Sequence, residues 1–168
     1  MNRKGFTLVE ILAVIAIIAV LSIVLVPNII ENYKNSTDKA MQLQENESLD
    51  GAKLFVEDFC RNPISSNHKC SNYEKTSTSG FVYFCLSTLQ SNIAIPGFDS
   101  EPYLPGVNFK GGVPCDGFIK FTKNGNAYED GKAYLVCKNP DETEYGYATE
   151  GYEAYTTELN SCLSKTKN

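Results

Sequence analysis

The chain has 168 residues, of which 20 are acidic and 15 are basic, so its formal net charge is −5. This length fits one domain of ordinary size plus a short extension. The acidic balance argues against a nucleic-acid-binding protein, because phosphate contacts by Lys and Arg dominate that kind of affinity.

The first predicted element is an apolar run over residues 6–26. Its 21 residues are enough to cross a hydrocarbon core of about 30 Å as a helix that rises about 1.5 Å per residue. Arg3 and Lys4 precede the run, and the positive-inside bias therefore places the N-terminus in the cytoplasm. We expect a single-pass protein of the inner (cytoplasmic) membrane, with the rest of the chain on the extracytoplasmic side.

Glu10 is the only ionisable residue within this run. A charged side chain at the bilayer centre costs about 2.5–3.5 kcal/mol even on lenient scales, so Glu10 is a candidate functional residue. Alternatively, Glu10 lies shallow enough to reach the membrane interface, where its charge suits a helix N-terminus. Small residues recur after it at every third position and would let neighbouring helices approach closely: Ala13, Ala16, Ala19 and Ser22.

Arg3 and Lys4 precede Gly5, Phe6 follows it, and Glu10 and Pro27 are the fifth and 22nd residues counted from Phe6. This pattern resembles the prepilin leader of type IV pilins and type II secretion pseudopilins, in which Phe6 would begin the mature chain. No A-x-A-like cleavage site follows the apolar run, and the first cysteine is Cys60, which argues against a secretory or lipoprotein signal. The resemblance covers roughly the first 60 residues.

This resemblance implies a processing step and an assembly role. Prepilin peptidase would remove residues 1–5 by cutting after Gly5, and would N-methylate Phe6. The Glu10 carboxylate would then pair with the Phe6 amine of a neighbouring subunit, which offsets the cost of burying each charge and fixes the stagger between subunits. The implied partners are copies of the chain or other pilin-like subunits, an assembly platform with its ATPase, and the membrane. The implied product is a cell-surface or periplasmic filament.

The apolar segment, residues 6–27, is followed by an amphipathic one. Over residues 28–62 apolar side chains recur mostly every three or four positions, which predicts a second half of the helix, stopped by Asn62-Pro63. Pro27 should kink or loosen the turn before it. A break at residues 35–38 or at Gly51, where helix propensity is low, is the alternative to one continuous helix.

Residues 63–168 are predicted to form a globular head. A polar loop is expected over residues 63–79 and an irregular connection over residues 96–117, because of their composition. Strands are predicted at residues 81–89, 118–121, 133–138 and 144–149, with a turn at Asp130-Gly131. The predicted fold class is α+β: a long N-terminal transmembrane helix, with a small antiparallel sheet of three or four strands packed on its C-terminal half.

Six cysteines lie on the expected outer side of the membrane, and an even number in an exported head indicates three disulfides. They are Cys60, Cys70, Cys85, Cys115, Cys137 and Cys162. Of the fifteen possible pairings we expect Cys60–Cys70, Cys85–Cys115 and Cys137–Cys162, the last of which resembles the disulfide-bounded C-terminal region of many type IV pilins. The alternative is a zinc site at Cys60, His68 and Cys70, although the sequence has no C-x2-C spacing.

No nucleophile elbow, phosphate loop or Gly-rich dinucleotide turn is present, so we expect no enzymatic activity, cofactor or metal. The alternative function is a single-pass, membrane-anchored head that binds a ligand or catalyses a reaction without polymerising.

Two further side-chain groups are candidates for recognition. Tyr145 and Tyr147 are predicted to share one strand face, either packed on the helix or available for contacts, with Tyr152 and Tyr155 nearby. Lys120 and Lys123 could form a small basic spot near a hairpin.

Overall fold

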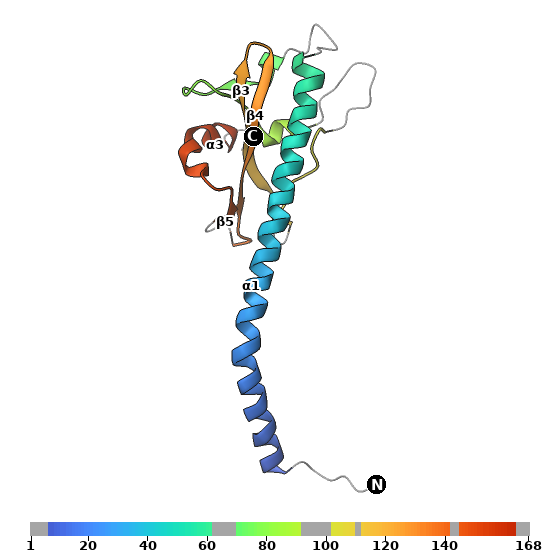
Figure 1. Cartoon of the computed structure of the whole chain (residues 1–168), viewed down its shortest axis with the longest axis vertical. Helices are drawn as coiled ribbons and strands as arrows, with labels where there is room; N and C mark the ends of the chain where they lie inside the picture. The colour runs from blue at the N-terminus through green and yellow to red at the C-terminus, as the bar shows by residue number, and fades with distance from the viewer. Residues whose placement is uncertain (1–6, 62–69, 92–101, 110–111, 142–144, 164–168) are drawn as a thin grey trace. The chain divides into compact units, whose positions relative to one another are not determined.

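The structure, a computed structural model, describes residues 7–61, 70–91, 102–109, 112–141 and 145–163, with the backbone alone for residues 23–28. The chain divides into two compact units, residues 1–40 and residues 41–168. Its elements, in chain order, are α1 (Leu8–Phe55), η1 (Val56–Arg61), η2 (Cys70–Asn72), β1 (Lys75–Thr76), β2 (Val82–Cys85), α2 (Leu86–Leu89), β3 (Cys115–Asn124), β4 (Ala127–Lys138), β5 (Tyr145–Ala148), η4 (Tyr152–Tyr155) and α3 (Thr156–Leu163) (Figure 1).

Helix α1 confirms the long N-terminal helix, and it continues as the π-helix η1 to Arg61. The alternative of a break at residues 35–38 or at Gly51 is wrong, since both lie inside α1. Gly51 instead allows close packing of the segment that contains Leu104. A Cβ placed at residue 51 would lie 2.3 Å from Leu104 Cδ2, so only glycine lets that segment lie against the helix. Pro27 also lies within α1, and its kink stays a prediction.

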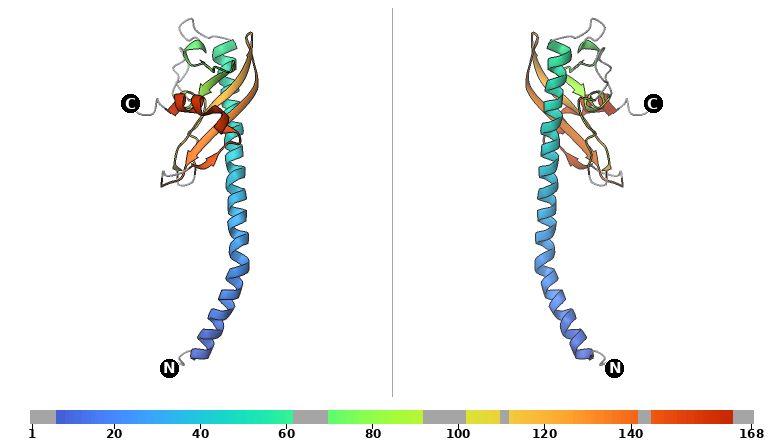
Figure 2. Two further views of the ribbon diagram at one scale, coloured as in Figure 1. Left: turned by 90° about the vertical axis from the view of Figure 1, so that its left-hand side faces the viewer. Right: turned by 90° about the vertical axis from the view of Figure 1, so that its right-hand side faces the viewer.

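Within the described residues the sheet has five antiparallel strands in the order β1-β2-β3-β4-β5, one more than the largest number predicted from the sequence. The additional strand is β1, which pairs with β2 and falls in the segment predicted as loop. Strands β3 and β4 form the long hairpin drawn in orange in Figure 2.

The predicted turn at Asp130-Gly131 is wrong, because both residues lie inside β4. The hairpin turns at Gly125, whose φ is 60°, and Asp130 has a φ of 51° within a β-bulge. A Cβ on Gly131 would lie 2.6 Å from Leu49 of α1 and 2.7 Å from Phe121, so the glycine lets the bulged strand pass close to the helix.

The predicted strand over residues 81–89 is shorter than expected. Only Val82–Cys85 is extended, and the next four residues form the helical turn α2. Leu86 and Leu89, three positions apart, are both fully buried, because one turn of helix points both side chains into the same core. The C-terminal elements η4 and α3 were not predicted.

Two hydrophobic clusters lie on opposite faces of the sheet, because successive strand side chains alternate. In Figure 1 the sheet lies between α3 and the C-terminal part of α1. The α1-side cluster is centred on Phe55, which stacks on Phe59 with ring centroids 4.9 Å apart. The α3-side cluster contains Phe81, Tyr83, Cys85, Phe118, Tyr134, Val136, Leu159 and Cys162.

All six cysteines form disulfides, paired Cys60–Cys70, Cys85–Cys162 and Cys115–Cys137. The first predicted pair is confirmed, and the other two predicted pairs are wrong. Cys115 and Cys137 face each other directly across β3 and β4 in the α1-side cluster, whereas Cys85 belongs to the α3-side cluster. A sheet separates Cys85 from Cys115, so Cys85 bonds to Cys162 of α3 instead.

Candidate assembly surface

Helix α1 begins with a reciprocal capping arrangement between Thr7 and Glu10. The Thr7 backbone N–H donates to Glu10 Oε2 at 2.8 Å, and the Thr7 hydroxyl donates to the same oxygen at 2.9 Å. In return, the Glu10 backbone N–H donates to Thr7 Oγ1 at 3.3 Å. This is the capping box expected of a Thr-x-x-Glu sequence, and it satisfies two backbone donors that a helix start leaves without partners.

Glu10 therefore has a local partner, which sequence reasoning missed although the Thr-x-x-Glu spacing could have shown it. Within the described residues no cation lies beside it, and both bonds that it accepts go to Oε2. The second carboxylate oxygen, Oε1, remains available for a further donor.

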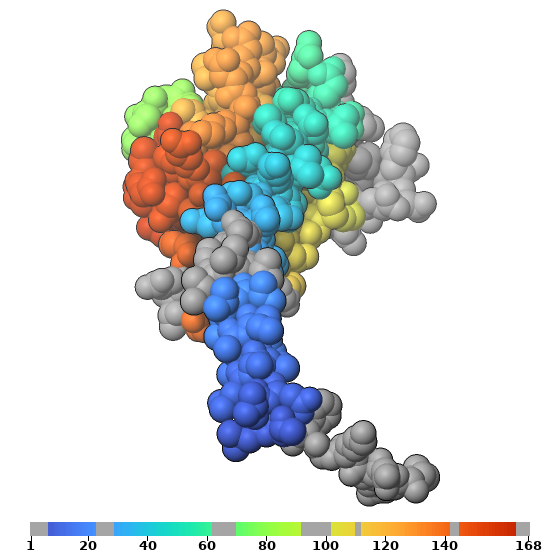
Figure 3. Space-filling model, turned by 60° about the horizontal axis from the view of Figure 1, so that its bottom comes forward, coloured from blue at the N-terminus to red at the C-terminus, as the bar shows by residue number. Residues whose placement is uncertain are grey.

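The turns of α1 that follow expose large apolar side chains in every direction. From Leu8 to Leu21 the Leu, Ile and Val residues are 51–77% exposed (dark blue in Figure 3). Ser22, which follows this run, donates its hydroxyl back to the Ile18 carbonyl at 2.7 Å. A helix that is apolar on all sides is typical of one surrounded by lipid or by other helices. Among the residues that the structure describes, none buries this surface.

In the described part of the chain, we find no helix that is sufficiently long and apolar to traverse a membrane. The predicted span over residues 6–26 includes Phe6 and the side chains of residues 23–26, which lie outside the described residues. The membrane span stays a prediction. Gly5 and His68 also lie outside the described residues.

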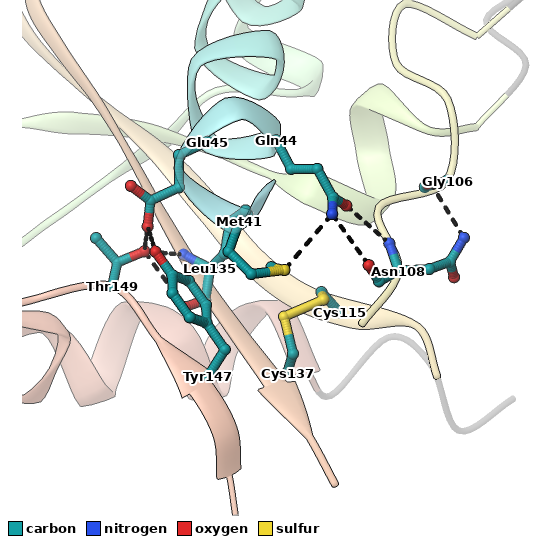
Figure 4. The surroundings of a disulfide bond; sticks show 10 residues. All are labelled: Met41, Gln44, Glu45, Gly106, Asn108, Cys115, Leu135, Cys137, Tyr147 and Thr149. Atoms are coloured by element: carbon teal, nitrogen blue, oxygen red, sulfur yellow. Dashed lines mark hydrogen bonds between the residues drawn. A yellow bond between two sulfur atoms is a disulfide. The ribbon is translucent and has the colours of Figure 1, made fainter. Parts of the chain in front are cut away.

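A second group of contacts fixes the C-terminal part of α1 on the head (Figure 4). Gln44 forms two hydrogen bonds with the backbone of Asn108, each 3.1 Å long, one donated and one accepted. The Glu45 carboxylate accepts hydrogen bonds from the hydroxyls of Tyr147 and Thr149. Helix α1 is thus held at both the connection before β3 and the edge strand β5.

Glu45→Ala is expected to lower the free energy of unfolding by about 1–3 kcal/mol, because a charged acceptor of two hydrogen bonds is lost. Chemical denaturation of the full-length chain in neutral detergent, followed by near-UV circular dichroism, measures this. The matched control is Glu47→Ala, an exposed acid two residues away on the same helix, which should change stability by less than about 0.5 kcal/mol. Equal effects of the two variants would show that Glu45 does not fix β5 on α1.

The tyrosines predicted to share one strand face do not do so. Tyr147 packs against the α1-side cluster, whereas the Tyr145 ring contacts Tyr152, which packs against the α3-side cluster. The reason is a register irregularity in the β4–β5 pairing, beside Cys137. The alternation of side chains is interrupted there.

Lys120 and Lys123 do not form a joint basic spot. Lys123 pairs with Glu74 at 2.8 Å, while Lys120 donates to the Tyr155 hydroxyl at 2.9 Å. The same β3–β4 hairpin brings Lys132 directly opposite Lys120 instead. Sequence reasoning missed this neighbour, because the register depends on the bulge at Asp130.

Comparison with protein families gives a match for the N-terminal segment of the chain. Residues 1–26 match the family model described as the prokaryotic N-terminal methylation motif. The N-terminal segment thus carries the prepilin-type signal of type IV pilins and pseudopilins, as its residues indicated. Searches of curated proteins and of solved structures gave no match to the chain.

Proposed function

We propose that the chain is a pilin-like or pseudopilin subunit of a filament of the type IV pilus, type II secretion or competence type. The observation that carries this proposal is the prepilin-type signal on residues 1–26, together with the exposed apolar turns of α1 from Leu8 to Leu21, among which Glu10 is the one carboxylate. Prepilin peptidase would cleave after Gly5, and the membrane would hold the subunit through residues 6–26. Its role would be structural rather than enzymatic.

The capping geometry suggests how Glu10 could direct assembly. Thr7 holds the carboxylate through Oε2 and so limits its rotation before a neighbour arrives. A methylated Phe6 amine from the next subunit could then donate to Oε1, completing an ion pair in an apolar surrounding. Such a pair is strongly favoured over two unpaired buried charges, so it would select one stagger between helices that could otherwise slide.

The proposed location follows from the same signal. Before assembly the subunit would reside in the inner (cytoplasmic) membrane, with its N-terminus in the cytoplasm and its disulfide-bonded head on the extracytoplasmic side. On assembly it would enter a surface or periplasmic filament. The assembly platform and its ATPase would supply the energy for extraction.

The deciding experiment is the intact mass of the unreduced protein from its native cells, with fragmentation of the N-terminus. We expect a chain that begins at N-methyl-Phe6 and is lighter by six hydrogens, two for each of the three disulfides. A chain that keeps residues 1–5 and has no methyl group would contradict the proposal and support a membrane-anchored head that does not polymerise.

Gly5→Arg should leave the leader attached, because the peptidase would no longer find a small residue at the cut. Mass spectrometry of the variant should then show residues 1–5 retained, and filaments should lack this subunit. Gly106→Ala, a distant glycine change in the head at a position with room for a Cβ, is the control and should leave cleavage unchanged. Normal cleavage of Gly5→Arg would show that the cut lies elsewhere.

A further inference from the structure

Lys120 and Lys132 form an unusual pair of like charges. They lie directly opposite each other on β3 and β4, an arrangement that destabilises a sheet. In the part of the chain that the structure describes, neither lysine has a carboxylate partner, although acids outnumber bases overall and Lys53, Arg61 and Lys123 each have one. The pair is therefore not explained by the stability of the sheet.

Aromatic rings hold both ammonium groups in place. Lys120 Nζ lies 4.6 Å from the centre of the Phe81 ring and 4.8 Å from that of Tyr155, to whose hydroxyl it donates. Lys132 Nζ lies 5.0 Å from the centre of the Tyr134 ring. Cation–π contacts of this kind orient the charges without neutralising them. Lys132 also donates to the Glu150 carbonyl at 3.4 Å, but an ammonium group has three donors, so each lysine keeps donors for a ligand.

The Tyr155 hydroxyl accepts a hydrogen bond from Lys120 and lies near both positive charges. The hydrogen bond from Lys120 lowers the pKa of Tyr155, helped by the hydrogen bond from Tyr134 and by the charges of both lysines. In the neighbouring Tyr134, burial raises the pKa to about 12. Two cations and one polarised hydroxyl thus point to an anionic ligand.

We propose that Lys120, Lys132 and the Tyr155 hydroxyl form a binding site for the carboxylate groups of an acidic polysaccharide, such as a polymer of uronic acids. The lysines would bind the carboxylate, and the hydroxyl would bind a sugar hydroxyl beside it. Nucleic acid fits less well. The Tyr155 ring is half-buried, with the Phe81 and Tyr134 centroids 5.5 Å and 4.8 Å away and Lys120 Nζ 4.8 Å from its centre, so little of it is open for stacking a base.

Charge density also favours the polysaccharide. Duplex DNA carries one negative charge per about 1.7 Å of its axis, and two lysines on a chain of net charge −5 would leave most of that charge facing acidic protein. A uronic-acid polymer has only one carboxylate per sugar. Its repulsion from the remaining acidic surface is therefore weaker.

The position of the site suits a filament. It lies on the sheet face that carries α3, opposite the face that packs on α1 (Figure 1). If α1 mediates assembly, as the proposed function holds, this opposite face stays accessible on each subunit. Repetition along a filament would then raise a weak single-site affinity through multivalency.

The test measures binding of the full-length chain, in neutral detergent, to immobilised polygalacturonate. We expect salt-sensitive binding that is about tenfold weaker in Lys120→Gln/Lys132→Gln, because two charged donors are lost. Lys53→Gln makes the same kind of charge change on α1 and should bind like the unchanged chain. Lys120→Arg/Lys132→Arg should keep binding, and methyl-esterified polygalacturonate, the same polymer without charge, should not bind.

Several results would overturn the proposal: no binding to polygalacturonate, equal binding by the double Gln variant, binding to the methyl ester, or tighter binding to duplex DNA. Near-UV circular dichroism must show that the double variant is folded. If the double variant is not folded, binding of the single variant Lys132→Gln is measured instead. Lys132 is exposed, and the loss of its charge should still weaken binding severalfold. None of these outcomes affects the processed mass that tests the proposed function.

Discussion

Glu10→Gln is expected to remove the subunit from filaments while leaving cleavage, methylation and membrane insertion intact. Glutamine keeps the shape of the side chain and can accept the two bonds from Thr7 that glutamate accepts. It cannot supply the negative charge for a neighbour's Phe6 amine. Leaving one member of a buried pair uncompensated costs about 3–5 kcal/mol, enough to reduce incorporation more than a hundredfold.

The comparison of Gln with Ala separates the two roles of Glu10. If charge pairing sets the stagger, Glu10→Gln and Glu10→Ala should fail equally, as measured by the amount of subunit in sheared filaments relative to the amount in membranes. If capping alone matters, Glu10→Gln should assemble normally, and Thr7→Val should fail instead. Normal filaments from Glu10→Gln would therefore refute the proposed ion pair.

Removing the Cys85–Cys162 disulfide should cause the largest loss of stability in the head. The bond closes a segment with a sequence separation of 77, and the chain-entropy model assigns about 4–5 kcal/mol to a loop of that size. Cys85→Ala/Cys162→Ala also removes the covalent attachment of α3 to the sheet and leaves Leu159 and the hydrogen bonds of Glu158 and Ser161 to hold it. We expect a lower denaturation midpoint and faster hydrogen exchange in residues 156–163.

The control for this prediction is Cys60→Ala/Cys70→Ala. Its disulfide spans a separation of only 10, for which the same model gives about 3 kcal/mol. Its effect on hydrogen exchange should fall near the end of η1 and spare α3. If both double variants lose stability equally and α3 keeps its protection, loop closure is not what holds the C-terminal helix on the sheet.

The helix and its N-terminal signal could be predicted because their causes are local. The apolar run, the position of Gly5 before Phe6, and Glu10 are features of neighbouring residues, and the family model matches the same segment. The periodicity through Phe55 and Phe59 likewise predicted the helical second half. Cys60–Cys70, the pair closest in sequence, was also predicted correctly.

The errors concern features that depend on residues far apart in the chain. Gly51 has low helix propensity, yet it lies inside α1, at the point where Leu104 packs against the helix. Asp130-Gly131 has the composition of a hairpin turn, yet it forms a bulge because the hairpin turns at Gly125. Propensity is a weak prior, and tertiary packing overrides it at both sites.

The sequence by itself determined the long helix, the lone carboxylate of its apolar run, the prepilin-type signal and a disulfide-bonded α+β head. Only the tertiary structure decided which cysteines pair, which tyrosines share a face and that Lys120 lies opposite Lys132. The physical reason is the twofold alternation of a strand: a single bulge or register shift reassigns side chains to the other face of the sheet. The position of such a bulge or register shift depends on contacts between segments that are distant in the sequence.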